Sequence, residues 1–137
     1  MTEVTPISKP KKRRPVRISR LDANFSLYIR LRDGRRCQRC FKQYPEGAQG
    51  VHNSHFVGRR NKAVRWDQDN CVALCMGCHE FFETHKATLY REWMIERLGQ
   101  ERFDSLVARS RAPVKRTQAE MAELGAEIRS LLRGLEE

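Results

Sequence analysis

The sequence lacks any apolar stretch that approaches the length of a membrane-spanning helix, and no hydrophobic segment follows its basic N-terminus. The first absence argues against a membrane protein, and the second argues against a secretory signal peptide. We therefore expect the chain to stay in a reducing cytoplasm. In that compartment, paired cysteines bind metal more often than they form disulfides.

Acidic residues are few: 17 Asp and Glu stand against 27 Lys and Arg, which gives a formal net charge of +10. This charge favours a polyanionic partner, because lysine and arginine side chains release counterions from a phosphate backbone. Nucleic acid is the first candidate and an anionic membrane surface the second. The 137 residues suit one domain with tails, and the core is small enough to need a further source of stability.

Residues 1–20 are predicted to form a disordered basic tail. The segment has a single acid, Glu3, and too few apolar residues to pack. Pro6, Pro10 and Pro15 would interrupt any helix. We interpret it as an arm that grips phosphate, with a solubilising tail as the alternative.

Two short-spaced thiol pairs, Cys37/Cys40 and Cys75/Cys78, are separated by 34 residues. Pairs of this kind can place four thiolates around one zinc ion. With the first pair on a knuckle and the second at a helix start, the layout is that of a treble-clef finger. Four protein ligands leave no open position, so this zinc would be structural. We expect the fifth cysteine, Cys71, to be a small buried apolar residue.

The remaining pattern predicts a small α+β fold in which helices flank a zinc-stapled core. Asp22 is the expected N-cap of the first helix, and Gly34 its stop. Apolar periodicity and turn residues predict the other elements. These are helices over 22–33, 75–86, 88–98, 101–108 and 115–137, and strands over 50–57 and 63–66.

The last helix carries apolar residues at the alternating spacing of a coiled-coil seam. Two interpretations stay open: the helix folds back on its own domain, or it forms the seam of a homodimer. The seam residues are Met121, Leu124, Ile128, Leu131 and Leu135.

A structural zinc does not require the histidines and asparagine that lie around these cysteines. His55 ends the first candidate strand, Asn70 follows a turn, and His79 comes directly after the last cysteine. His85 lies six residues after His79, off the same helical face, and we expect it to be an ordinary surface or core residue.

This order of His, Asn and His, threaded through two Cys-x-x-Cys pairs, resembles the HNH, or ββα-metal, nucleases. The resemblance implies that His55 is the general base that activates water, and that Asn70 orients that base or supports the loop. It also implies that His79 binds a catalytic divalent metal beside the scissile phosphate. A neutral imidazole can take a proton near neutral pH, and an ion with few protein ligands keeps positions open for phosphate and water.

One position departs from the usual HNH pattern, in which Asp directly precedes the base as a metal ligand. Ser54 stands there. His52 would share Ser54's strand face and could supply the missing ligand, which gives a His52/His79 site for Mg²⁺ or Mn²⁺. Imidazole-rich ligation would shift the preference toward Mn²⁺, Ni²⁺ or Zn²⁺. In the alternative, His52 only packs and the metal is held weakly.

An ordered set of motifs between about Asp22 and Leu106 is similar to the NinG/Rap family of lambdoid-phage recombination proteins. In that family the His-x-Ser-His-Phe arrangement replaces Asp-His. The resemblance implies a structure-directed DNA endonuclease that acts at D-loops and Holliday junctions, in the cytoplasm of a bacterial host. The motifs are Ser26-x2-Ile29-Arg30-x-Arg32-Asp33-Gly34, CQRC, His52-x-Ser54-His55-Phe56, Arg65-Trp66-Asp67-x2-Asn70 and LCMGCH.

Four basic residues lie between the base strand and Asn70: Arg59, Arg60, Lys62 and Arg65. We expect them to face the DNA backbone beside the metal, with a solvated charged turn as the alternative.

The sequence as a whole predicts a basic tail over 1–20, an HNH-like zinc-binding nuclease domain over 21–112 and a C-terminal amphipathic helix over 113–137. Two rivals remain. One is a zinc-finger DNA-binding protein without catalysis, which the missing Asp at position 54 favours. The other is an RNA-binding or interaction module that works through the tail and the last helix.

Overall fold

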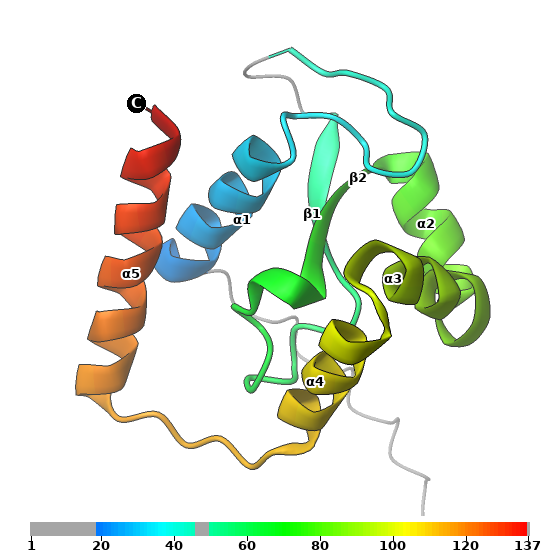
Figure 1. Ribbon diagram of the computed structural model, residues 1–137. Coiled ribbons are helices and arrows are strands. Elements are labelled where there is room, and N and C mark those ends of the chain that lie inside the picture. The colour runs from blue at the N-terminus through cyan, green and yellow to red at the C-terminus, as the bar shows by residue number, and fades with distance from the viewer. Residues whose placement is uncertain (1–18, 46–49, 137) are drawn as a thin grey trace, which may run out of the picture.

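The computed structural model describes residues 19–45 and 50–136, and these form a small α+β structure (Figure 1). Most of the predicted basic tail lies outside the described residues. No described helix combines the length and the apolar character needed to cross a bilayer. The elements are α1 (Arg20–Arg32), β1 (Val51–His55), the 3-10 turn η1 (Gln68–Asn70), β2 (Cys71–Cys75), α2 (Met76–Thr84), the π-helical turn η2 (Lys86–Tyr90), α3 (Arg91–Leu98), α4 (Gln100–Arg111) and α5 (Gln118–Glu136).

The sheet has two antiparallel strands, β1 and β2, with Val51 opposite Cys75 and His55 opposite Cys71. The predicted second strand over 63–66 is wrong, because those residues form turns. The second strand of the sheet is instead β2, and its first four residues, 71–74, are all buried. Helices α1 and α2 cover opposite sides of the sheet (Figure 1), so β2 has no polar face and no alternating pattern.

Helix α1 begins at Arg20, two residues earlier than predicted. Ser19, not Asp22, is the N-cap: its hydroxyl accepts a hydrogen bond from the Asp22 amide, and the Asp22 carboxylate accepts one from the Ser19 amide. This reciprocal capping box uses Asp22 as its third helical residue. The helix ends before Gly34, as predicted, where φ is +68°.

The predicted helices over 75–86 and 88–98 join through η2 without an intervening loop. The π turn brings Tyr90 into the core, where its ring stacks on Phe82 with 4.5 Å between centroids. Gly99 ends α3 as predicted, with φ at +85°, and α4 is longer than the expected segment 101–108.

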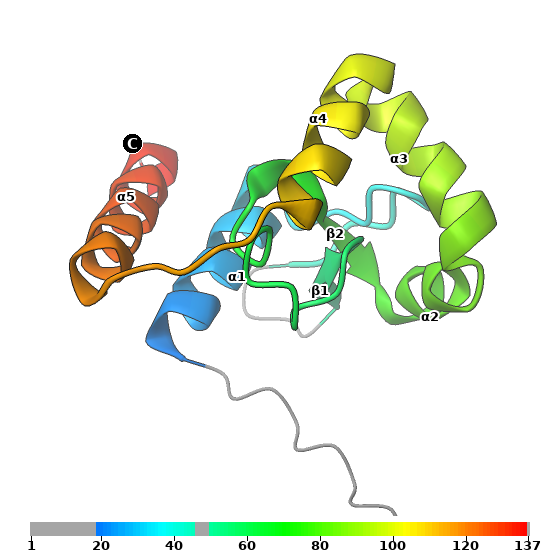
Figure 2. The ribbon, with the colours of Figure 1, turned by 90° about the horizontal axis from the view of Figure 1, so that it is seen from below.

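Helix α5 lies beside α1 and apart from α3 and α4 (Figure 2). Ile128 is 2% exposed, and Leu124 and Leu131 pack with it against the buried face of α1. Leu135, at the end of the predicted seam, is 43% exposed. Of the two interpretations, this geometry corresponds to a helix that folds back on its own domain. A separate unit over 113–137 stays a prediction, and the homodimer stays the alternative that a measurement of molar mass in solution would decide.

Candidate metal centre and active site

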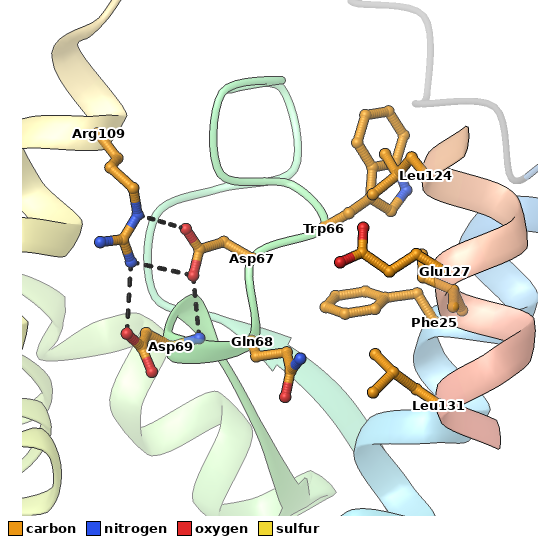
Figure 3. A pocket seen from close by; sticks show the side chains of 10 residues that line it. Phe25, Trp66, Asp67, Gln68, Asp69, Arg109, Leu124, Glu127 and Leu131 are labelled. Atoms are coloured by element: carbon orange, nitrogen blue, oxygen red, sulfur yellow. Dashed lines mark hydrogen bonds and ion pairs between the residues drawn. The ribbon is translucent and has the colours of Figure 1, made fainter. Parts of the chain in front are cut away.

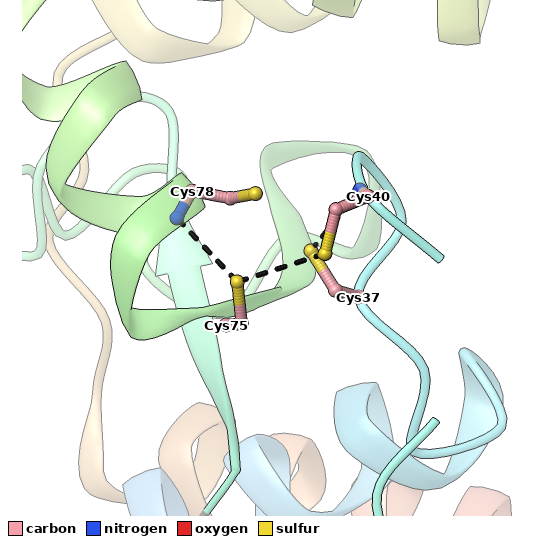
Figure 4. Close-up of side chains that lie close together, drawn as sticks. All are labelled: Cys37, Cys40, Cys75 and Cys78. Atoms are coloured by element: carbon pink, nitrogen blue, oxygen red, sulfur yellow. Dashed lines mark hydrogen bonds between the residues drawn. The ribbon is translucent and has the colours of Figure 1, made fainter. Parts of the chain in front are cut away.

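The four paired cysteines meet at one point (Figure 4), where their sulfur atoms all lie within 4.8 Å of one another. The sulfurs of Cys40 and Cys75 are 3.8 Å apart. Four thiolates at a zinc–sulfur distance of 2.3 Å form a tetrahedron with edges of about 3.8 Å. The cluster could therefore hold a structural zinc ion without a large rearrangement.

In each Cys-x-x-Cys pair, a backbone amide donates a hydrogen bond to a sulfur atom of the same pair. The amide of Cys40 donates to the sulfur of Cys37, and the amide of Cys78 donates to the sulfur of Cys75, both at 3.5 Å. Cys75 is also the N-cap of α2, so its sulfur lies at the positive end of that helix. Against the effect of burial, backbone hydrogen bonds lower the pKa of Cys37 to about 7, which favours the thiolate, the form that binds zinc.

Sequence reasoning missed Arg39, which lies between the first two cysteines. Its guanidinium donates to the sulfur of Cys78 at 3.5 Å. It also lies 4.0 Å from the ring centroid of Phe81. A positive charge held here would balance part of the negative charge of a four-thiolate zinc centre.

Cys71 is 1% exposed in β2 and lies outside the cluster. Burial raises the pKa of its thiol well above the usual range. Its expected role as a small buried residue is confirmed.

A second candidate site contains none of the four clustered cysteines. His52, His55 and His79 line one open cavity of about 620 Å³. Arg59 and Arg60 line the same cavity, together with two carboxylates of α2 that the sequence did not single out, Glu80 and Glu83. The three histidines predicted to act together are thus brought to one place.

His55 has a defined hydrogen bond. Its Nε2 lies 2.9 Å from the backbone carbonyl oxygen of Arg65. A carbonyl can only accept, so Nε2 carries the proton and Nδ1 keeps its lone pair. Burial, with the charges of Arg59 and Arg65, lowers the pKa of His55 to about 4, against the opposing effect of the carbonyl. The ring is therefore neutral at physiological pH.

His52 and His79 face each other from β1 and α2, with ring centroids 6.4 Å apart and planes inclined by 37°. Two imidazoles at adjacent positions of one metal, at a nitrogen distance of about 2.1 Å, have centroids roughly 4.5 to 5.5 Å apart, so these two rings would have to move about 1 Å closer to share an ion. The Nδ1 atom of His79 is buried and has no hydrogen-bond partner. Burial, followed by lesser effects that include the nearby His52, lowers the pKa of His79. Two imidazoles that face each other, one with an unused nitrogen, could hold a divalent cation if the rings approached.

The match to the family model of the bacteriophage lambda NinG protein covers residues 8–137. The chain belongs to the NinG family. No curated protein and no solved structure matches the chain.

In this NinG-family chain, Asn70 supports the loop that follows β1, and its side-chain hydrogen bonds go to the backbone of Val57 and Val64 and not to the His55 ring. Its side chain is fully buried. Its oxygen accepts from the Val57 amide at 2.7 Å, and its nitrogen donates to the carbonyls of Val57 at 2.9 Å and Val64 at 3.0 Å. The bond to Val64 fixes the residue directly before Arg65. The carbonyl of Arg65 in turn accepts the hydrogen bond from His55.

The loop is also held from outside, at a separate cavity of about 450 Å³ between α5, α1 and η1 (Figure 3). There Arg109 of α4 donates to Asp67 at 2.7 and 3.1 Å and to Asp69 at 3.4 Å. None of the predicted site residues lines this cavity.

The four basic residues of the predicted DNA surface do not lie together. Arg59 and Arg60 line the histidine cavity, and Lys62 is exposed outside its lining. Arg65 is only 7% exposed and donates two hydrogen bonds to Asp22, at 2.9 and 2.6 Å. A guanidinium used in this way has little surface for a phosphate, so Arg65 differs from the exposed Lys62 and from Arg59 and Arg60, which line the cavity.

Neither Ser54 nor His85 lines the histidine cavity. Ser54 is fully buried, and its hydroxyl lies 2.8 Å from that of Tyr90, so it does not enter the cavity. The ring of His85 packs on Phe81, with 4.7 Å between centroids, and does not line the cavity either. It therefore offers a matched histidine outside the site.

Proposed function

We propose that this chain is a metal-dependent DNA endonuclease of the HNH, or ββα-metal, type. The order β1, β2, α2 has the strand–strand–helix sequence of that superfamily, and the histidines lie on its first strand and its helix. NinG family membership and the net charge of +10 support a DNA substrate.

The observation that carries the proposal is the hydrogen bond from His55 Nε2 to the Arg65 carbonyl. It holds the imidazole in the tautomer whose Nδ1 can accept a proton, and the lowered pKa keeps that atom unprotonated. We assign His55 as the general base that takes a proton from the attacking water.

His52 and His79 would hold the divalent metal, Mg²⁺ or Mn²⁺, at the other end of the cavity. When bound, such an ion neutralises charge on the phosphate oxygens. Glu83 follows His79 by one helical turn and lines the same cavity, so α2 presents both an imidazole and a carboxylate to it. The four clustered cysteines would hold a structural zinc that joins the knuckle to α2.

Arg59 and Arg60 would receive the DNA backbone at the cavity mouth, with Lys62 further along the loop. We further propose branched DNA, such as D-loops or Holliday junctions, as the substrate, and phage recombination in the bacterial cytoplasm as the setting. These last assignments rest on the family resemblance.

The test is cleavage of labelled linear duplex and four-way-junction DNA with EDTA, Mg²⁺ or Mn²⁺. We expect metal-dependent cutting that is lost in His55→Ala while DNA binding is retained. The matched control, His85→Ala, removes an imidazole outside the cavity and should cut at the wild-type rate. Equal cutting by His55→Ala and the wild type would exclude His55 as the base.

A zinc-finger DNA-binding protein without catalysis is the second candidate. One observation favours it: the residue before His55 is the buried Ser54, so the carboxylate ligand usual at that position is missing. This candidate predicts binding without cutting in any metal, and identical behaviour of His55→Ala and the wild type.

A further inference from the structure

Asp22 of α1 holds the loop that carries the His55 partner. Its carboxylate accepts from Arg65 Nε at 2.9 Å and from Arg65 Nη2 at 2.6 Å, as a two-pronged ion pair. It also accepts from Trp66 Nε1 at 3.0 Å. The side chains of Asp22 and Arg65 are each only 9% exposed, so this contact is shielded from water and salt.

Arg65 therefore makes one contact through its side chain and another through its backbone. Its side chain is bound by Asp22, and its backbone carbonyl accepts a hydrogen bond from His55 Nε2 at 2.9 Å. The adjacent residue, Val64, is held through its own carbonyl by Asn70. A carbonyl fixed by anchors on both sides has little freedom to rotate away from the imidazole.

The same carboxylate also faces a second arginine. Arg59 Nη2 lies 4.0 Å from Asp22 Oδ2, and the Arg59 side chain is 33% exposed where it lines the histidine cavity. Asp22 thus balances two positive charges that would otherwise both face the His55 ring. Hydrogen bonds from Arg65 and Ser19 outweigh the effect of burial and lower the pKa of Asp22 to about 2, so it stays ionised.

We propose that Asp22 is a positioning residue for the catalytic base: through Arg65 it fixes the carbonyl that sets the tautomer and orientation of His55. This inference rests on the proposed role of His55. It assigns to α1, which contributes no predicted catalytic residue, a part in the chemistry of the cavity.

Two variants break the link in different ways. Asp22→Asn removes the charge, and Arg65→Met removes the guanidinium while the backbone carbonyl and the Asp22–Ser19 capping bonds remain. We expect each to lower the single-turnover cleavage rate about 10- to 100-fold, as a misplaced catalytic group does, with DNA affinity changed less than about twofold. The double variant should lose no more than the single ones, because both remove one link.

The control is Ser19→Ala, which weakens the same end of α1 but leaves the Asp22–Arg65 contact in place. It should cut at the wild-type rate at a temperature where all variants are folded. Asp22→Asn or Arg65→Met with the rate of Ser19→Ala would overturn the proposal.

A readout without DNA separates this inference from the proposed function. The ring nitrogens of His55, followed by ¹⁵N NMR, should show one tautomer with the proton on Nε2 in the wild type and in Ser19→Ala. Asp22→Asn and Arg65→Met should show a mixture. If the wild type cuts no DNA yet the variants still shift the tautomer, the positioning holds and the nuclease does not. An unchanged tautomer in both variants would refute the positioning.

Discussion

The hydroxyls of Ser54 and Tyr90 lie 2.8 Å apart inside the protein, between β1 and the π turn η2. Ser54 is fully buried, and so is Tyr90. Burial raises the pKa of Tyr90 well above its usual range, so the phenol keeps its proton and each hydroxyl has a partner. The position that is a metal-binding Asp in the usual HNH pattern is here part of the core.

This contact predicts that restoring the usual residue will not improve the site. Ser54→Asp would place a carboxylate in the core beside Tyr90, and we expect it to lower the free energy of unfolding by more than about 2 kcal/mol. Metal affinity, measured by calorimetry with Mn²⁺, should not rise. The control, Ser54→Ala, adds no charge and should cost only about 1 kcal/mol. A stable Ser54→Asp protein with tighter Mn²⁺ binding would contradict this account.

The cysteine cluster predicts one zinc ion per chain and a fold that depends on it. Cys75→Ala removes a ligand and opens the N-cap of α2, so we expect zinc loss and loss of cooperative thermal unfolding. Cys71→Ala is the matched control, because Cys71 is a buried cysteine outside the cluster. It should keep one zinc by elemental analysis and unfold cooperatively. Equal zinc content in Cys75→Ala and Cys71→Ala would contradict the assignment of the four clustered cysteines as zinc ligands.

Local sequence patterns were sufficient for the helices and for the gathering of the four cysteines. Short spacing brings Cys37 near Cys40 and Cys75 near Cys78, and the stops at Gly34 and Gly99 are properties of single residues. Alternation did not predict that His52 and His55 line one cavity, because residues three apart on a strand point to opposite faces; the family resemblance supplied that expectation.

What the sequence could not reveal depends on contacts between distant residues. Strand β2 was missed because helices cover both its sides, which removes the alternation that marks a strand. Arg65 looked like a DNA contact, because nothing local indicates that Asp22 binds it from 43 residues away. The role of Ser54 in the core was missed for the same reason, since its partner Tyr90 is 36 residues further along.

The lowered pKa of His55 predicts the shape of the pH–rate profile. With a pKa of about 4 in place of 6.5, the base stays unprotonated through mildly acidic pH. At saturating metal, kcat should therefore change less than about twofold between about pH 7.5 and 5.5, whereas a base with an ordinary pKa would lose about tenfold. A tenfold fall with a midpoint near the ordinary value would contradict the assignment of His55.

The same shift has a consequence for stability, with a definite sign. Below pH 6.5 the unfolded chain protonates His55, but the folded protein does not until the pH falls through about 4. Because the unfolded state binds the extra proton, the free energy of unfolding falls as the pH falls through this window, by on the order of 3 kcal/mol in all. His55→Ala lacks this contribution. Its stability relative to the wild type, from urea unfolding, should therefore improve toward acid pH.

Docking of α5 on α1 predicts that single seam residues contribute to the stability of the domain. Ile128 is 2% exposed among Phe25, Tyr28 and Ile29, so Ile128→Ala should lower the free energy of unfolding by about 2 to 4 kcal/mol. Leu135→Ala, at a position that is 43% exposed, should cost less than about 0.5 kcal/mol. If instead the seam served a homodimer, both variants would lower the molar mass measured by light scattering. We expect that mass to be monomeric and unchanged, because the apolar side of α5 is already covered by its own α1.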